Sequence, residues 1–196
     1  MLASITPLGE RGRQATWGIT VSAFLLGATA AGMALGALAG AVGGLVLPAA
    51  LHAHGRLLIL ALAVLAAIGL DARRKAVPGP RRQVDERWLD QYRGWVYGVS
   101  YGAQLGLGLT TVVASAATYV ALVAAVLSAD AARGALILGC FGFIRGLTPL
   151  AGRRVHSPAQ LVSLHRWLAG RRQTVRAGAI AGLTAILVLA LAGSVG

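Results

Sequence analysis

The sequence predicts an all-α, polytopic integral membrane protein with about five transmembrane helices. Its 196 residues are 57% hydrophobic and 12% charged, whereas soluble domains carry roughly 25% charged residues. The mean hydropathy is +0.72. Most basic residues fall into three clusters that border long apolar runs: Arg11 to Arg13, Arg73 to Arg93, and Arg153 to Arg176. A chain this apolar requires an apolar solvent, so we expect it to fold in a bilayer.

Five apolar segments are the predicted spans. They run over Trp17 to Leu47, Leu57 to Leu70, Trp95 to Leu127, Ala131 to Leu150, and Ala177 to Val195. The first and third exceed the roughly 20 residues that cross a hydrocarbon core, so they must tilt strongly, break or protrude. The first is also far longer than the apolar run of about 7 to 15 residues in a signal peptide, so we expect it to be a retained span.

The placement of arginine predicts the topology. With about five spans all three basic clusters share one face, whereas with about seven the richest cluster would face the other way. The positive-inside rule therefore places the amino terminus in the cytoplasm and the clusters at anionic headgroups. Because these clusters border apolar runs, the net charge of +12 does not indicate nucleic acid binding. The preference for arginine, with Lys75 as the single lysine, is typical of a GC-rich bacterial genome and predicts a bacterial plasma membrane.

An internal repeat is predicted at an offset of 80 positions. The matched pairs include Glu10 with Asp90, Arg13 with Arg93, Trp17 with Tyr97, Gly18 with Gly98, and Arg73-Arg74 with Arg153-Arg154. Two spans per copy keep the orientation, so these are parallel repeats. We expect one membrane domain over residues 1–196, with repeats at about 10–74 and 90–154, then a surface helix and the last span over 155–196.

Two amphipathic helices are expected at the cytoplasmic surface. Val84 to Gly94 mixes acids, arginines and aromatics, as helices at the headgroup level do. Ser157-Pro158 offers an N-cap followed by proline at the first helical position. The helix that follows would carry Leu161, Leu164, Trp167 and Leu168 on one face.

Small residues recur every fourth position in the first and third segments. Such stripes let two helix backbones approach closely. We interpret them as helix-packing faces, with a sliding interface or room for a substrate as the alternative. The stripes comprise Gly32, Gly36, Gly40, Gly44, Gly98, Gly102 and Gly106.

The third segment is the most polar span and supplies candidate pathway or ligand residues. These are Gln104, Thr110, Thr111 and Ser115. Interhelical hydrogen bonding is the alternative role for them. Arg145 is a further candidate because an intramembrane arginine usually faces a partner or a pathway. From its depth, about one turn inside the fourth span, it could instead snorkel to the headgroups.

No pattern of catalytic, cofactor or metal-binding residues stands out. His52 and His54 lie in a short connection without a nearby acid or cysteine, too little for a metal site. Asp71 is followed by arginines, so we expect it to form surface ion pairs. Cys140 is the single cysteine and cannot form a dithiol relay within this chain. We therefore expect no enzymatic activity and no cofactor.

Two stretches, Gly102 to Gly108 and Gly139 to Leu150, resemble helices of a known family. Gly-Phe-Ile-Arg-Gly-Leu-Thr-Pro in the second resembles the transmembrane thiol-disulfide carriers of cytochrome c biogenesis (the DsbD type) and the small exporters grouped near them. The resemblance implies a six-span inverted repeat with a cysteine in each half. This sequence departs from that pattern in its span number, its parallel repeats and its lone Cys140, so no functional residue is carried over.

Two functions follow as hypotheses. The first is a small transporter or exporter of a small polar solute or ion, working as a homo-oligomer because so few spans leave little room for a pathway. The second is a non-catalytic subunit or assembly factor that packs against other membrane subunits through its glycine faces.

Overall fold

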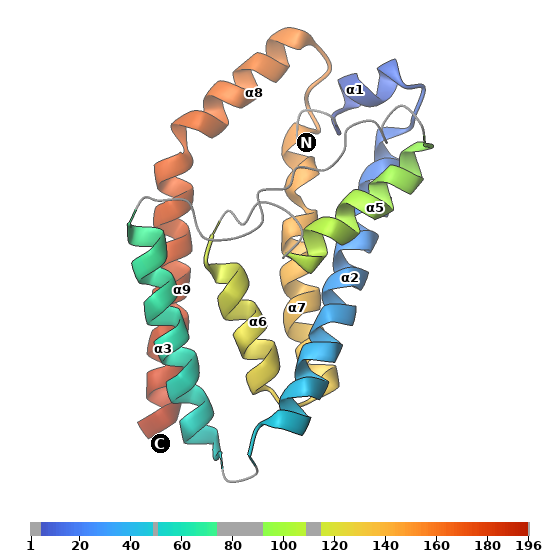
Figure 1. Cartoon of the computed structure of the whole chain (residues 1–196). Coiled ribbons are helices and arrows are strands. Elements are labelled where there is room, and N and C mark those ends of the chain that lie inside the picture. Colours follow the sequence, from blue (N-terminus) through green and yellow to red (C-terminus); the bar gives the residue numbers. More distant parts are fainter. Residues whose placement is uncertain (1–4, 49–50, 74–91, 109–114, 196) are drawn as a thin grey trace. The chain divides into compact units, whose positions relative to one another are not determined.

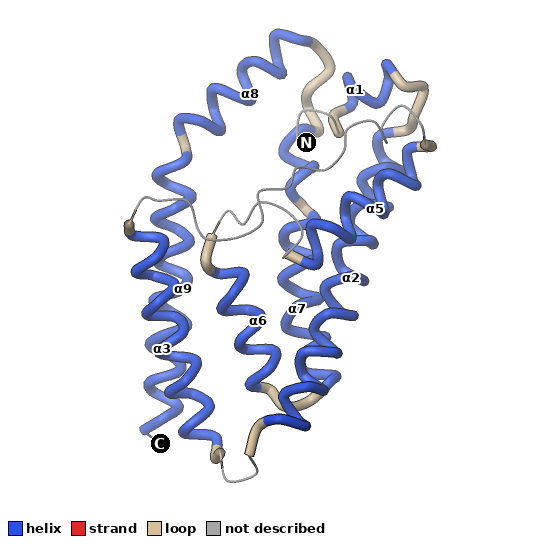
Figure 2. Tube along the Cα trace, viewed as in Figure 1, coloured by secondary structure: helices blue, strands red, loops and turns tan. Residues whose placement is uncertain are grey.

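The computed structural model describes residues 5–48, 51–73, 92–108 and 115–195 (Figure 1). Every regular element in these ranges is helical (Figure 2). Four helices are long and apolar enough to cross a membrane, over Trp17–Val46, Ala53–Ala72, Ala131–Gly152 and Gln173–Gly193, and a shorter apolar helix covers Ala117–Leu127. The predicted class, an all-helical polytopic membrane protein, is confirmed.

The helices follow the predicted apolar segments closely. In chain order they are α1 (Pro7–Gly12), α2 (Trp17–Val46), α3 (Ala53–Ala72), α5 (Gly94–Leu107), α6 (Ala117–Leu127), α7 (Ala131–Gly146), the 3-10 helix η1 (Thr148–Gly152), α8 (Pro158–Gly170) and α9 (Arg172–Val195). Of the two over-long segments, the first forms one continuous helix of 30 residues. At about 1.5 Å per residue, α2 is longer than the roughly 30 Å hydrocarbon core, so it must tilt or protrude.

The third apolar segment is divided into two helices. α5 ends at Leu107, and Gly108 caps it in the left-handed region at φ 66°. Glycine adopts this conformation without a steric penalty, which makes it a common helix terminator. A new helix, α6, begins at Ala117. The third segment was expected to tilt, break or protrude, and the structure shows that its helix breaks.

The chain forms two compact units. The first comprises the described parts of Met1–Met33, Pro80–Val112 and Gly139–Arg172, and the second those of Ala34–Gly79, Val113–Leu138 and Gln173–Gly196. Each unit therefore takes residues from both predicted repeats, about 10–74 and 90–154. This division does not test the repeat, which stays a prediction.

In the first unit, α2 and α5 lie backbone to backbone. A Cβ atom added to Gly102 would collide with the carbonyl oxygen of Phe24, and one added to Gly106 with that of Ala28. One turn earlier, a Cβ on Gly98 would lie 2.6 Å from the Thr20 carbonyl oxygen of α2. These three glycines are four residues apart, so they share one face of α5.

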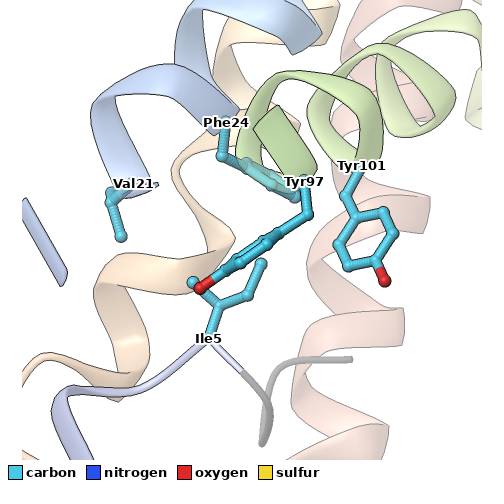
Figure 3. Packing of buried hydrophobic residues seen from close by; sticks show 5 residues of the cluster. All are labelled: Ile5, Val21, Phe24, Tyr97 and Tyr101. Carbon is cyan, nitrogen blue, oxygen red and sulfur yellow. The ribbon is translucent and has the colours of Figure 1, made fainter. Parts of the chain in front are cut away.

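An aromatic core lies beside this contact. Val21 and Phe24 of α2 pack with Tyr97 and Tyr101 of α5 and with Ile5, which precedes α1 (Figure 3). All five side chains are buried. The two tyrosine rings lie 6.0 Å apart, a separation at which aromatic pairs attract.

α2 and α7 also approach closely. In the first unit, a Cβ on Gly142 would collide with the Ala28 carbonyl and would lie 3.6 Å from Cα of Gly32. In the second unit, substituents on Gly36 and Gly40 would collide with backbone carbonyls of residues 134 and 130, and one on Gly44 would lie 3.0 Å from the carbonyl oxygen of residue 129. The small residues of α2 thus face backbone in both units.

The core of the second unit lies among α3, α6 and α9. Val64, Val120 and Leu183, one from each helix, are buried together. α3 and α9 lie side by side (Figure 1), and a Cβ on Gly193 would lie 3.2 Å from the Leu57 side chain.

The surface helix α8 begins as its sequence predicts. The Ser157 hydroxyl accepts a hydrogen bond from the Gln160 amide at 3.4 Å, and Pro158 is the first helical residue. Leu161, Leu164 and Leu168 are half-buried, while Trp167 is 51% exposed. The helix expected over Val84 to Gly94 lies almost wholly outside the described residues.

Gly102→Ala should lower the free energy of unfolding by about 1–3 kcal/mol, because the new methyl group meets a backbone carbonyl that cannot move aside cheaply. Denaturation by SDS in mixed micelles would measure this. The matched control is Gly182→Ala in α9, where an added Cβ has nothing within 4 Å. Equal losses in both variants would contradict the close contact between α2 and α5.

Candidate functional site

The described candidate pathway residues fall in both units. Gln104 is half-buried in α5 and Arg145 is half-buried in α7, both within the first unit. Ser115 precedes α6 in the second unit, and Thr110 and Thr111 lie outside the described residues. Their role as a pathway therefore stays a prediction.

Arg145 lies against an aromatic ring of its own helix. Its guanidinium carbon is 5.5 Å from the centroid of the Phe141 ring. Nη1 is buried and makes no hydrogen bond with any described residue. A guanidinium in this state is suited to an anion, to a polar solute or to headgroup oxygens.

Asp71 makes no ion pair with any residue that the structure describes. Most of the basic residues that follow it lie outside the described residues, so its surface ion pairs stay a prediction. Asp71 lies near the end of α3, and its Oδ2 accepts a hydrogen bond from the Ser115 hydroxyl at 2.8 Å. Its Oδ1 accepts one from the Ala116 amide at 3.0 Å. The carboxylate therefore caps the start of α6, where the helix dipole favours negative charge.

A second polar cluster surrounds Glu10, which is completely buried. Thr6 caps α1 by accepting from the Gly9 amide at 3.2 Å, and Pro7 is the first helical residue. After α1 the chain turns sharply through Gln14, whose φ is 54°. The Ala15 amide donates to the Glu10 carbonyl at 2.9 Å, which keeps the turn closed.

Three side chains donate to the Glu10 carboxylate. Tyr97 donates through its hydroxyl to Oε2 at 2.6 Å, and Thr20 to the same oxygen at 2.7 Å. Arg13 donates through Nη2 to Oε1 at 2.8 Å. The donors come from the turn after α1, from α2 and from α5, so this carboxylate joins three segments.

The charge of Arg13 is stabilised by the same cluster. Burial alone would lower the pKa of its guanidinium, but the hydrogen bond to Glu10 and the nearby Tyr97 outweigh it and raise the pKa. The guanidinium carbon also lies 5.6 Å from the centroid of the Tyr97 ring. A buried carboxylate costs several kcal/mol unless it is paired and hydrogen-bonded, and both conditions are met here.

Sequence reasoning used Glu10 only as a repeat match and missed this cluster. The available signal was local: Thr6-Pro7 marks a helix start, and Arg13, which caps that helix, follows Glu10 by three residues. No local pattern indicates Tyr97, which is 87 positions from Glu10.

The Glu10 carboxylate stabilises the fold and offers no accessible oxygen for binding or catalysis. The three donors occupy both carboxylate oxygens of Glu10, which is inaccessible to a solute. In the described residues no group of three or more His, Cys, Asp or Glu side chains is placed to hold a metal ion. Cys140 is a free, exposed thiol.

The chain is distantly homologous to two bacterial proteins named methylamine utilization protein MauF. It is 31% identical over 180 residues to MauF of Paracoccus versutus, covering 88% of this chain and 62% of that protein. It is 35% identical over 162 residues to MauF of Paracoccus denitrificans, covering 80% of this chain and 57% of that protein. The chain thus spans about three fifths of the length of these curated relatives.

No protein-family model and no solved structure matches the chain. The homology supports in part the family resemblance drawn from the sequence, and it supports a multi-pass membrane protein with bacterial relatives.

Glu10→Gln should lower the free energy of unfolding by about 2 kcal/mol, because it leaves the partly buried Arg13 without its counter-charge. Tyr97→Phe should cost about 1.5 kcal/mol, the value of one hydrogen bond to a charged group. SDS titration of both variants and of their double mutant would measure the coupling. Strictly additive losses would contradict the contact between these two side chains.

Proposed function

We propose that this multi-pass membrane protein transports a small polar solute or ion and performs no catalytic step. The division of the third apolar segment at Gly108 carries the proposal. At membrane depth, interrupted helices are tolerated where they are buried in protein or line a water-filled cavity. Secondary transporters bind their substrates at such discontinuous helices.

The polar groups that flank the division support this function. In the second unit, Asp71 and Ser115 meet at the start of α6. In the first unit, Gln104 precedes the end of α5 by one turn. Thr110 and Thr111 lie between these helices in the sequence. Carboxylates within membrane-spanning bundles are a common feature of ion and substrate pathways, and Asp71 lies near the end of α3, a helix apolar enough to cross a membrane.

Small organic cations such as methylammonium are the class of solute that the chain is proposed to transport. The relatives are named for methylamine utilization, and a small amine is cationic at neutral pH. The Asp71 carboxylate has the complementary charge. Together with Ser115, it offers a cation the oxygen atoms that could replace lost hydration.

A second candidate function is that of an accessory subunit or assembly factor. The relatives' name favours it, because it refers to a utilization system and not to transport. The glycine faces would then bind other membrane subunits. As a transporter, by contrast, the chain would work as a homo-oligomer, because so few spans leave little room around a pathway.

The amino terminus is proposed to lie in the cytoplasm of a bacterial cell. Arg11 and Arg13 precede α2, whereas Arg153 and Arg154 follow η1. The Leu8 amide donates to the Val155 carbonyl at 3.1 Å, so the two segments meet, and the positive-inside rule would place both in the cytoplasm. Anionic lipid headgroups would face them there.

Proteoliposomes containing the protein should take up radiolabelled methylammonium faster than protein-free vesicles, and Asp71→Asn should reduce the rate at least about tenfold by removing the charge. Asparagine keeps an oxygen that can accept from the Ala116 amide and gains an NH₂ group that can donate to the Ser115 hydroxyl, so stability should hold. The matched control is Asp130→Asn, because the exposed Asp130 carboxylate caps α7 through the Arg133 amide at 2.7 Å.

Two results would contradict transport of this solute through the Asp71 region. One is uptake by the wild type that does not exceed uptake by empty vesicles. The other is an equal loss of uptake in the Asp71 and Asp130 variants. The first result would favour the accessory function.

A further inference from the structure

A pocket of about 460 Å³ lies beside the Glu10 cluster in the first unit. Its walls come from the turn before α2, the first turn of α2 and the start of α5. The charged, polar and aromatic residues that line it include Arg13, Gln14, Thr16, Tyr92, Arg93 and Trp95. The volume falls in the range of roughly 300–1,000 Å³ that small-molecule sites occupy.

The charged side chains that line the pocket are both cationic. Arg13 and Arg93 contribute guanidinium groups, and no carboxylate is among the described lining residues. Glu10 is completely buried behind Arg13 and does not line the pocket. The buried Glu10 carboxylate offsets the charge of Arg13, so Arg93 leaves one net positive charge at the pocket, which favours an anion.

The Arg13 guanidinium is preorganised for such a ligand. Its bond to Glu10 fixes the guanidinium, and its side chain is 21% exposed. Arg93 immediately precedes α5 and is exposed. Arginine presents its donors in a fork that matches the oxygens of phosphate groups, and a preorganised guanidinium loses less entropy on binding.

The uncharged part of the lining suits a phosphate that carries an organic group. Gln14 and Thr16 offer hydrogen-bonding side chains. The aromatic residues Tyr92 and Trp95 are 50% and 54% exposed. Tyrosine and tryptophan are enriched where a bilayer meets water, at the level of the headgroups.

In a bilayer, we expect the pocket to lie near the level of the headgroups. The pocket adjoins the amino-terminal end of α2, a helix long and apolar enough to cross the membrane. We propose that this pocket binds a phosphate-bearing anion through Arg13 and Arg93, either the headgroup of an anionic phospholipid or a free phosphate ion. The site shares no residue with the Asp71 region and does not depend on the transport proposal.

Native mass spectrometry of the detergent-purified chain, titrated with dihexanoyl phosphatidylglycerol and in parallel with inorganic phosphate, would test the site. Dihexanoyl phosphatidylcholine serves as a zwitterionic control. We expect Arg93→Gln to weaken binding of the anion at least about fivefold, since one charge-assisted contact is lost. Arg13→Lys should weaken it as well, because lysine keeps the charge and loses the fork.

The matched control is Arg11→Gln, which removes an exposed arginine of α1 that does not line the pocket. Saturable binding of phosphatidylglycerol that depends on Arg13 and Arg93 would identify a lipid headgroup. Arginine-dependent binding of inorganic phosphate alone would identify a free ion. The proposal is overturned if neither probe binds saturably to the wild type, if phosphatidylcholine binds equally well, or if Arg11→Gln weakens binding as much as Arg93→Gln.

Discussion

Between α2 and its neighbours, backbone lies directly against backbone, and the arrangement of each unit depends on this contact. Lipid tails are as apolar as the helices, so the hydrophobic effect does not drive the helices together. Helix association must therefore be stabilised by the dispersion contacts that form when two backbones approach closely. Gly102 and Gly106 allow this approach against α5 in the first unit, and Gly36 and Gly40 allow it against the start of α7 in the second.

This packing also positions the polar clusters. Since α5 lies against α2, Tyr97 comes within hydrogen-bonding distance of Glu10, and the Arg13 guanidinium is then fixed at the wall of the pocket. Gly94 belongs to the same contact, because a Cβ there would lie 2.6 Å from the Thr20 hydroxyl. The buried ion pair, the aromatic core and the pocket are thus consequences of one helix contact.

The spans were predictable from the sequence, whereas the polar contacts were not. Apolar length is a local property, so the segments at Trp17–Val46 and Ala53–Ala72 could be located without a structure. The position of the break after α5 could not be predicted, because the glycines that precede Gly108 continue the helix while Gly108 ends it. The hydrogen-bond partner of Asp71 could not be predicted either. Arginines follow Asp71 in the sequence, whereas the hydroxyl that donates to it belongs to Ser115, 44 positions away.

The central functional claim is that the chain acts alone as a transporter and not as one subunit of a larger complex. Mass measurement of the protein, purified in a mild detergent or a native nanodisc together with any bound chains, tests this most directly. We expect a defined homo-oligomer free of other subunits. A foreign protein present in stoichiometric amount would contradict the claim and identify the chain as an accessory subunit.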